Sequence, residues 1–257
     1  MPGISKGPVV VIPARLAATR LPDKPLAPIA GEPMIVHVWR RAVEARLGAV
    51  VVACGEQRIA DAVIRAGGTA VLTDPALPSG SDRVFQALQR FDPEGGHDPV
   101  VNLQGDLPTL DPALPAAAVA AMEALHADMG TLVCPIARDP ERTDPNVVKA
   151  VVAWRDARVG RALYFSRAAV PAGEGELLHH IGLYAFRRRA LARFVALPPS
   201  ALERRERLEQ LRALEDGMSI AAARVDTVPL GVDTPADLER ARAILAAPRS
   251  PSPSSRP

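Results

Sequence analysis

The chain has 257 residues, of which 48% are hydrophobic and 23% charged, and its formal net charge is +2. This composition is typical of a globular domain and excludes a chain that is disordered along most of its length. The near-neutral charge excludes the overall basic field that supplies nonspecific nucleic-acid binding, so any anion site must be local.

The cysteines and the N-terminus bear on the cellular compartment. Cys54 and Cys134 lie in the apolar stretches VVVACG and TLVCPI, which predicts buried thiols in a reducing compartment. The apolar run near the N-terminus is too short for a signal peptide, and no window approaches the roughly 18 apolar residues of a membrane-spanning helix. We therefore expect a cytoplasmic protein that does not enter a membrane.

The first 125 residues alternate β-branched runs with amphipathic helical patterns. Strands are predicted at 9–12, 49–54, 69–73 and 99–103. Helices are predicted at 34–45, 57–66, 82–91 and after Asp111, and Gly67 and Gly68 end the second of them. Regular alternation of strand and helix predicts a mostly parallel sheet covered by helices.

From about residue 130 the pattern changes. Four strand-like runs, GTLVCPI, NVVKAVVAW, RALYFSR and HIGLYAF, follow with little helix between them, which predicts added antiparallel or edge strands. Helical patterns return at 190–197 and in one long segment, 201–217, whose mixed glutamates and arginines are typical of a solvated helix.

The C-terminal part ends with a strand and a well-marked helix start. The run IAAARV is the last predicted strand, and Thr234, Pro235 and Asp237 form the start signal of the last helix. We predict one α/β domain over 1–247 with a β-rich subregion at about 130–190. The proline- and serine-rich tail, 248–257, is predicted to be disordered.

The loop after the first predicted strand, PARLAATRLPDKPL, carries Arg15, Arg20 and Lys24. Ligands of open parallel sheets bind beyond the carboxyl ends of the strands, where this loop is expected. Three cations on a proline-limited loop suit a polyphosphate, because each donates charge-assisted hydrogen bonds to phosphate oxygens. A solvated surface loop is the plain alternative. We favour phosphate binding, since Lys24 is one of only three lysines among 31 basic residues; no Walker A motif is present.

The segment LPSGSDRV places Ser79, Gly80 and Ser81 before a helix that carries Arg83. Backbone amides at a helix start favour an anionic or polar ligand group. A plain serine cap explains Ser81 equally well, and from this segment alone we favour the plain cap.

Two further strand ends carry an aspartate each. Asp106 follows Gly105 in NLQGDLP, and Asp233 lies in PLGVDTPADL. A carboxylate that faces a polyphosphate is a natural Mg²⁺ ligand, since Mg²⁺ takes one or two protein carboxylates plus substrate phosphates. A turn aspartate and a helix-dipole partner are the plain alternatives. We favour the hypothesis that both carboxylates converge on one metal ion.

Polar residues also recur in the β-rich region, where Lys149, Arg167, His180 and Tyr184 are found. By the period of two, His180 and Tyr184 share one face of a strand and could form a polar wall opposite the phosphate loops. A histidine satisfied within the core is the plain alternative, and no third ligand at zinc spacing accompanies the HH pair.

Ten segments together resemble one family, the 3-deoxy-manno-octulosonate (Kdo) cytidylyltransferases. They are IPARLAATRLPDKPL, GEPMIVHV, AGG, PSGSDR, VNLQGDLP, PNVVK, ALYFSRAAVP, HIGLYAF, LEQLRAL and GVDTPADLERA. They follow the family's order from about residue 9 to 245. Each segment is weak evidence alone, but the collinear set is very specific.

The resemblance implies a nucleotide-diphospho-sugar transferase fold: a Rossmann-like, mostly parallel mixed sheet flanked by helices, with an inserted β-rich subregion for sugar binding and dimerisation. It also implies a cytoplasmic homodimer that makes CMP-Kdo from CTP and Kdo with Mg²⁺, for lipopolysaccharide assembly.

Site residues follow from the resemblance position by position. Those implied for catalysis are Arg15, Lys24, Asp106 and Asp233, and the two aspartates are the implied metal ligands. Those implied for nucleotide binding are Arg15, Arg20, Lys24, Ser79, Gly80, Arg83, Gln104 and Asp106. Those implied for Kdo binding are Gln104, Arg167, His180, Tyr184, Glu209 and Gln210.

The chain departs from the family pattern at Leu107, where Glu is usual, and in a short segment between Pro171 and His179. A CMP synthetase for a related sugar acid, such as 8-amino-Kdo or a sialic acid, is the nearest alternative function. A catalytically silent nucleotide-binding regulator is a more distant one.

Overall fold

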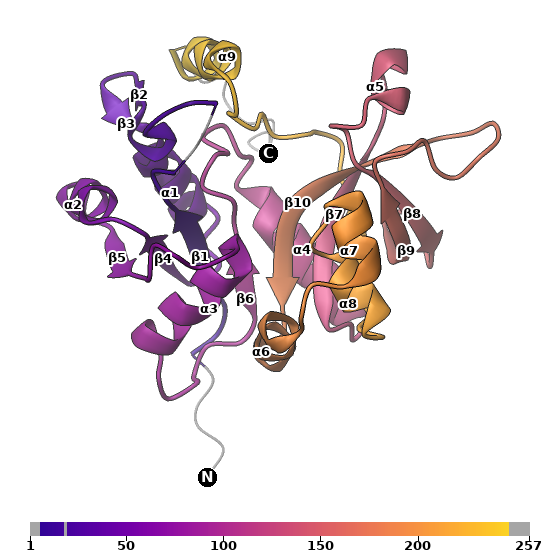
Figure 1. Cartoon of the computed structure of the whole chain (residues 1–257), viewed down its shortest axis with the longest axis horizontal. Coiled ribbons are helices and arrows are strands. Elements are labelled where there is room, and N and C mark those ends of the chain that lie inside the picture. Colours follow the sequence, from indigo (N-terminus) through magenta and orange to yellow (C-terminus); the bar gives the residue numbers. More distant parts are fainter. Residues whose placement is uncertain (1–5, 18–19, 247–257) are drawn as a thin grey trace, which may run out of the picture.

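The computed structural model describes residues 6–17 and 20–246 (Figure 1). A nine-stranded sheet has the order β5-β4-β1-β6-β10-β7-β11-β9-β8. Its strands are β1 Val9–Ala14, β4 Ala49–Cys54, β5 Thr69–Leu72, β6 Val100–Asn102, β7 Met129–Pro135, β8 Lys149–Trp154, β9 Val159–Ser166, β10 Leu178–Phe186 and β11 Ile220–Arg224. A separate pair consists of β2 Pro28–Ile29 and β3 Glu32–Pro33.

Helices cover both faces of the sheet. They are the 3-10 helix η1 Lys24–Leu26 and the α-helices α1 Met34–Glu44, α2 Gln57–Arg65, α3 Gly80–Phe91, α4 Ala113–Ala124, α5 Asp139–Thr143, α6 Arg188–Ala196, α7 Ala201–Glu206, α8 Leu211–Glu215 and α9 Pro235–Ala246. Successive strand residues point to opposite faces, which creates two cores. Val10 and Ile12 of β1 belong to the core with α1, α2 and α4, whereas Val9 and Val11 belong to the core with α3, α6 and α8. Both cysteines are buried, as predicted.

The sheet is mixed, as predicted. β4, β1 and β6 run parallel, and β5 continues the parallel set beyond β4. β10 is antiparallel to both β6 and β7 and occupies the middle of the sheet, while β8 and β9 form its far edge. Tyr184 of β10 is therefore the direct neighbour of Asn102 at the carboxyl end of β6.

The predicted continuous helix over 201–217 is wrong. α7 ends at Glu206, because Arg207 adopts left-handed backbone angles (φ 56°, ψ 46°), and α8 begins only at Leu211. Helical propensity is a local property, and here contacts with a distant strand override it. The glutamates of this segment are consequently not all on a solvated face.

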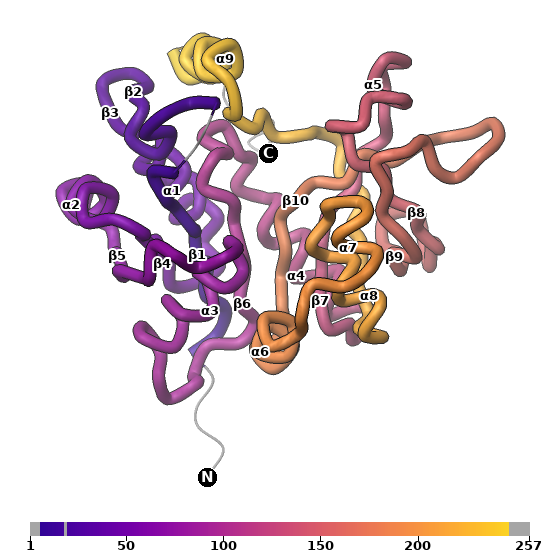
Figure 2. Tube along the Cα trace, in the orientation of Figure 1, coloured from indigo at the N-terminus to yellow at the C-terminus, as the bar shows by residue number. Residues whose placement is uncertain are grey.

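The C-terminal segment joins the two halves of the molecule. Figure 2 shows the yellow C-terminal segment crossing the upper part of the view to α9, and α9 contacts β2. The Arg242 guanidinium donates to the Pro28 carbonyl at 2.7 Å. The predicted helix start is confirmed, since the Asp237 N–H donates to Thr234 Oγ1 (3.2 Å) and Thr234 donates back to the Asp237 carboxylate.

Two predictions concern membrane-spanning helices and the C-terminal tail. No helix in the described ranges 6–17 and 20–246 is long and apolar enough to cross a bilayer. The tail at 248–257 lies outside the described residues.

Candidate active site

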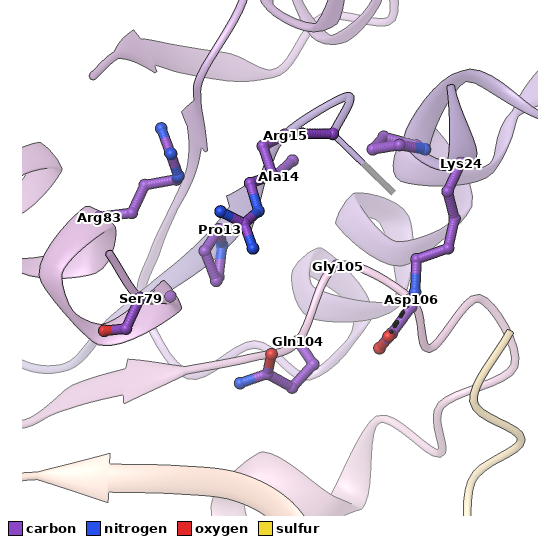
Figure 3. A pocket seen from close by; sticks show the side chains of 12 residues that line it. Pro13, Ala14, Arg15, Lys24, Ser79, Arg83, Gln104, Gly105 and Asp106 are labelled. Atoms are coloured by element: carbon purple, nitrogen blue, oxygen red, sulfur yellow. Dashed lines mark hydrogen bonds and ion pairs between the residues drawn. The ribbon is translucent and has the colours of Figure 1, made fainter. Parts of the chain in front are cut away.

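A pocket of about 290 Å³ opens at the carboxyl ends of the parallel strands (Figure 3). Three loops meet there, after β1, after β5 and after β6, as the rule for open parallel sheets predicts. Its lining residues are Pro13, Ala14, Arg15, Ala17, Lys24, Pro25, Ser79, Gly80, Arg83, Gln104, Gly105 and Asp106.

Lys24, Asp106 and Asp233 converge at one side of this pocket. The Lys24 Nζ lies 2.9 Å from Asp106 Oδ2 and 2.9 Å from Asp233 Oδ1, and Figure 3 shows Lys24 reaching down to Asp106. Burial alone would lower the pKa of Lys24, but the two carboxylates outweigh it and raise that pKa. The lysine is therefore fully protonated at neutral pH.

Backbone contacts explain why the two aspartates meet. The Val232 N–H donates to the Asp106 carbonyl at 3.0 Å, so the segment before α9 runs beside the loop after β6. Gly105 permits the close approach of that loop to β1, because a Cβ there would lie 2.6 Å from the Pro13 carbonyl oxygen. A larger residue would displace Asp106 from the pocket.

The donor set at this point fits a magnesium ion. Asp106 and Asp233 already enclose a single cationic group, the Lys24 ammonium, and their side chains remain 28% and 50% exposed. Within the described residues no group of three or more His, Cys, Asp or Glu could hold a metal by itself. Two carboxylates with an open side match an ion that completes its coordination with water and substrate phosphates.

The arginines of the first loop differ in their surroundings. Arg15 follows β1 directly, and its guanidinium points into the pocket in Figure 3. Among the described residues no carboxylate forms an ion pair with it, so its charge can meet a ligand. Arg20 lies outside the pocket lining, 3.2 Å from Asp233, and is 65% exposed.

The start of α3 corrects one prediction about the serines. Ser79, and not Ser81, is the N-cap: its Oγ accepts from the Asp82 N–H at 3.2 Å. Arg83 lines the pocket but is 2% exposed, and it donates to Thr73 Oγ1 and to the Asp74 and Pro75 carbonyls. These bonds hold the loop that leads into α3 in place. Burial lowers the pKa of Arg83.

A chain of hydrogen bonds connects the pocket with Glu209, in the segment between α7 and α8. Gln104 Nε2 donates to Asn102 Oδ1 (3.4 Å), Asn102 Nδ2 to Ser81 Oγ (3.4 Å), and Ser81 Oγ to Glu209 Oε2 (3.0 Å). The sequence reading did not identify Asn102 as a site residue. A polar side chain inside the apolar run VVNL was the available signal. Glu209 Oε1 is buried and makes no geometrically acceptable hydrogen bond within the described residues. Burial raises the pKa of this carboxyl group and outweighs the nearby hydroxyls of Ser79 and Ser81, which lower it.

Gln210 follows Glu209, the last member of these hydrogen-bonded residues, and pairs with His180. His180 is 6% exposed; its Nε2 contacts Thr131 Oγ1 at 3.0 Å, and its Nδ1 accepts from Gln210 Nε2 at 3.4 Å. Burial lowers the pKa of His180 to about 3, so the ring is neutral. The Tyr184 ring lies 5.6 Å away, and burial raises its pKa. His180 is therefore a satisfied core histidine. Neither His180 nor Tyr184 is among the residues that line the pocket, so the polar wall opposite the phosphate loops stays a prediction.

Arg167 and Lys149 bind backbone carbonyls. Arg167 donates to the carbonyls of Glu206 (2.8 Å), Pro145 (2.8 Å) and Arg207 (3.3 Å). Lys149 is fully buried and donates to three carbonyls, including that of Arg167. These contacts make both cations part of the framework that joins the end of β9 to the end of α7 and to the loop before β8, and a direct contact of Arg167 with a sugar stays a prediction.

Comparison with known proteins decides the family. A family model described as cytidylyltransferase matches residues 9–220. The 3-deoxy-manno-octulosonate cytidylyltransferase of Parvibaculum lavamentivorans is 67% identical over 93% of both chains. That of Rhodospirillum centenum is 67% identical over 95% of this chain and 96% of the relative. The chain belongs to the 3-deoxy-manno-octulosonate cytidylyltransferase family.

A solved structure extends this family assignment to three dimensions. CMP:2-keto-3-deoxy-manno-octonic acid synthetase, solved in complex with CTP, superimposes with a TM-score of 0.86 at 38% identity, covering 93% of this chain and 98% of that one. This cytidylyltransferase is thus a nucleotidyltransferase in fold and in family. Leu107, the departure next to Asp106, is 8% exposed within the core around α1 and α4. The departure therefore places an apolar side chain in the core where the family pattern has a carboxylate, and it leaves Lys24, Asp106 and Asp233 in place.

Proposed function

We propose that this cytidylyltransferase transfers the cytidylyl group of CTP to Kdo, giving CMP-Kdo and diphosphate. The observation that carries the proposal is the convergence of Lys24, Asp106 and Asp233 beside a pocket at the parallel strand ends. The names of the 67% identical relatives and the CTP in the related solved structure support both substrates.

In the proposed reaction the anomeric hydroxyl of Kdo attacks the α-phosphorus of CTP in line, and diphosphate leaves. Such reactions depend mainly on positioning and on stabilising charge. Arg15 would bind α-phosphate oxygens from the end of β1, and Lys24 would turn from the carboxylates to the leaving diphosphate. Asp106 and Asp233 would hold Mg²⁺, which supplies charge neutralisation at the phosphate oxygens when bound.

The sugar acid would lie on the side of the pocket formed by the hydrogen-bond chain. Gln104 lines the pocket, and Glu209 keeps an unpaired carboxylate oxygen that could accept from a sugar hydroxyl. Neutral His180, Gln210 and Tyr184 would shape the wall behind them. The cytoplasmic location, the homodimer and the role in lipopolysaccharide assembly stay predictions from the resemblance.

Diphosphate release with CTP, Mg²⁺ and Kdo tests the proposal. The assay is repeated with UTP, with sialic acid and with 8-amino-Kdo in place of the matching substrate. We expect release that depends on both CTP and Kdo, because the reaction needs the sugar hydroxyl as nucleophile. Release without any sugar acid would contradict the proposal, and faster turnover of 8-amino-Kdo would change the assigned substrate.

Asp106→Asn is the matched variant for the metal ligand, since it removes the charge and keeps the shape. We expect its turnover to fall at least a hundredfold at fixed Mg²⁺. Asp61→Asn, which removes a carboxylate bonded to Gln57 on α2, should leave turnover within twofold. Equal turnover in Asp106→Asn and the wild type would refute the assignment. CTP binding without turnover of any sugar acid would favour a regulator.

A further inference from the structure

Glu206, at the C-terminal end of α7, is not among the residues to which the proposed reaction assigns a role. Its carboxylate accepts from Ser166 Oγ (2.8 Å), from the Arg167 N–H (3.0 Å) and from the Tyr164 hydroxyl (3.5 Å). Ser166 and Tyr164 belong to the end of β9, and Arg167 directly follows it. Their sequence separation from Glu206 is about 40 residues, so local helical propensity does not determine this contact.

Arg167, which directly follows β9, also binds the backbone carbonyls at the end of α7. Arg167 Nε donates to the Glu206 carbonyl (2.8 Å), and its Nη2 donates to the Arg207 carbonyl (3.3 Å). Carbonyls at a helix C-terminus lack partners within the helix and need such donors. Arg207 is left-handed at φ 56°, a conformation in which the Cβ of an L-residue crowds the following carbonyl. The contacts with β9 therefore stabilise the end of α7 at Arg207, which is otherwise unfavourable.

The break decides where the next side chains point. In a continuous helix Glu206, Glu209 and Gln210 would be neighbours on one face, because residues three and four apart lie side by side. In the structure Glu206 contacts β9, whereas Glu209 accepts from Ser81 at the start of α3 and Gln210 donates to His180 of β10. The contacts of the Glu206 carboxylate thus separate three side chains that a continuous helix would place on one face.

We propose that Glu206 is a positioning residue for the sugar-acid side of the site: its bonds to the end of β9 stop α7 at Arg207 and turn Glu209 and Gln210 toward α3 and β10. The inference rests on the proposed function, since Glu209 and Gln210 serve the sugar acid there. Figure 1 shows α7 and α8 together in front of the sheet, beside β10 and β7.

The test compares KM values for Kdo and for CTP in Glu206→Ala and Glu206→Gln. We expect Glu206→Ala to raise KM for Kdo at least tenfold and to leave KM for CTP within twofold. Glu206→Gln keeps a carbonyl oxygen for one β9 donor and should raise KM for Kdo less than threefold. Ser166→Ala, which removes one donor only, should raise KM for Kdo by a factor between those of Glu206→Gln and Glu206→Ala. This variant tests the inference even if Glu206→Ala does not fold.

Ser200→Ala is the control for a general loosening of α7. It removes the N-cap that accepts from the Glu203 N–H (3.3 Å) at the other end of the helix. We expect a lower unfolding midpoint and a KM for Kdo within twofold of the wild type. An equal rise in Ser200→Ala, or an unchanged KM for Kdo in folded Glu206→Ala and Ser166→Ala, would overturn the inference.

Hydrogen exchange separates this inference from the proposed function. The amides of Leu208, Leu211 and Arg212 are bonded within the turn, and we expect them to exchange at least tenfold faster in Glu206→Ala than in the wild type or Ser200→Ala. Absence of any turnover of Kdo by the wild type would defeat the proposed function alone. Unchanged exchange at these amides would defeat the positioning role.

Discussion

Replacing Lys24 with methionine removes the charge at the centre of the site and keeps an unbranched side chain. In the structure the ammonium group lies 2.9 Å from both Asp106 and Asp233, and the lysine side chain is 18% exposed. Among the described residues the substitution leaves Asp106 without an ion-pair partner, whereas Asp233 keeps its ion pair with Arg20 at 3.2 Å. It also removes the cation that we assign to the leaving diphosphate, so stability and catalysis should both fall.

The structure indicates that the loss of stability and the loss of catalysis differ in size. Partly exposed ion pairs contribute about 1 kcal/mol or less each, and the Asp106 and Asp233 side chains are 28% and 50% exposed. We therefore expect the free energy of unfolding to fall by about 1 to 2 kcal/mol. Loss of one preorganised group that stabilises transition-state charge costs about 10²–10³-fold in kcat, roughly 3 to 4 kcal/mol. The catalytic loss should exceed the stability loss.

Diphosphate release and urea unfolding of Lys24→Met, Lys24→Arg and Lys6→Met measure the two losses. Lys24→Arg keeps the charge in a different shape and should recover part of the activity. Lys6→Met removes another lysine bound to a carboxylate, that of Asp92, and should leave kcat/KM within twofold. A fall in kcat/KM of less than tenfold in Lys24→Met would refute a phosphate-binding role. A stability loss above about 4 kcal/mol would instead indicate a buried structural ion pair.

Two further substitutions test a buried ion-pair cluster at the end of α3 and the loop after β6. Burial alone would raise the pKa of Asp92, but the His97 N–H, Lys6 and Arg188 hold that pKa well below its usual 3.8. Because the folded pKa is depressed, this stabilisation is present above about pH 4 and is lost as the pH falls below it. Asp92→Asn should therefore lower the free energy of unfolding by about 3 kcal/mol at pH 7 and by much less at pH 2; an equal loss at both pH values would contradict the argument. Gly105→Ala places a Cβ 2.6 Å from the Pro13 carbonyl oxygen and should cost about 1 to 3 kcal/mol in urea unfolding while raising KM for CTP; a fully stable variant with normal KM would show that the loop can shift freely.

Much of the fold could be predicted from local patterns. The strands and helices predicted up to residue 125 follow from β-branched runs, amphipathic periodicity and the glycines after α2, and the structure confirms them within a few residues. The short elements η1, β2 and β3 were not predicted. The position of the pocket also followed, because parallel strands end at one edge of the sheet and their loops must meet there. Arg15, Lys24, Gln104 and Asp106 were predicted on that basis or from the resemblance, and all line the pocket.

Other features depend on contacts between distant parts of the chain. The sequence pattern did not place β10 in the middle of the sheet, because strand order depends on which edges pair after the chain has collapsed. It also assigned Ser81 to a cap, whereas the cap is Ser79 and Ser81 links Asn102 with Glu209. Hydrogen bonds between side chains more than 20 positions apart leave no periodic signal.

The sequence by itself therefore determined most of the elements, the edge of the sheet that holds the site and the charged groups available there. Only the tertiary structure decided how those groups are used. Lys24 meets Asp233 because the segment before α9 crosses back over the sheet, and the helix over 201–217 breaks because β9 binds Glu206. Propensity and periodicity act within a few residues, whereas these partners lie about 40 to 209 positions apart along the chain.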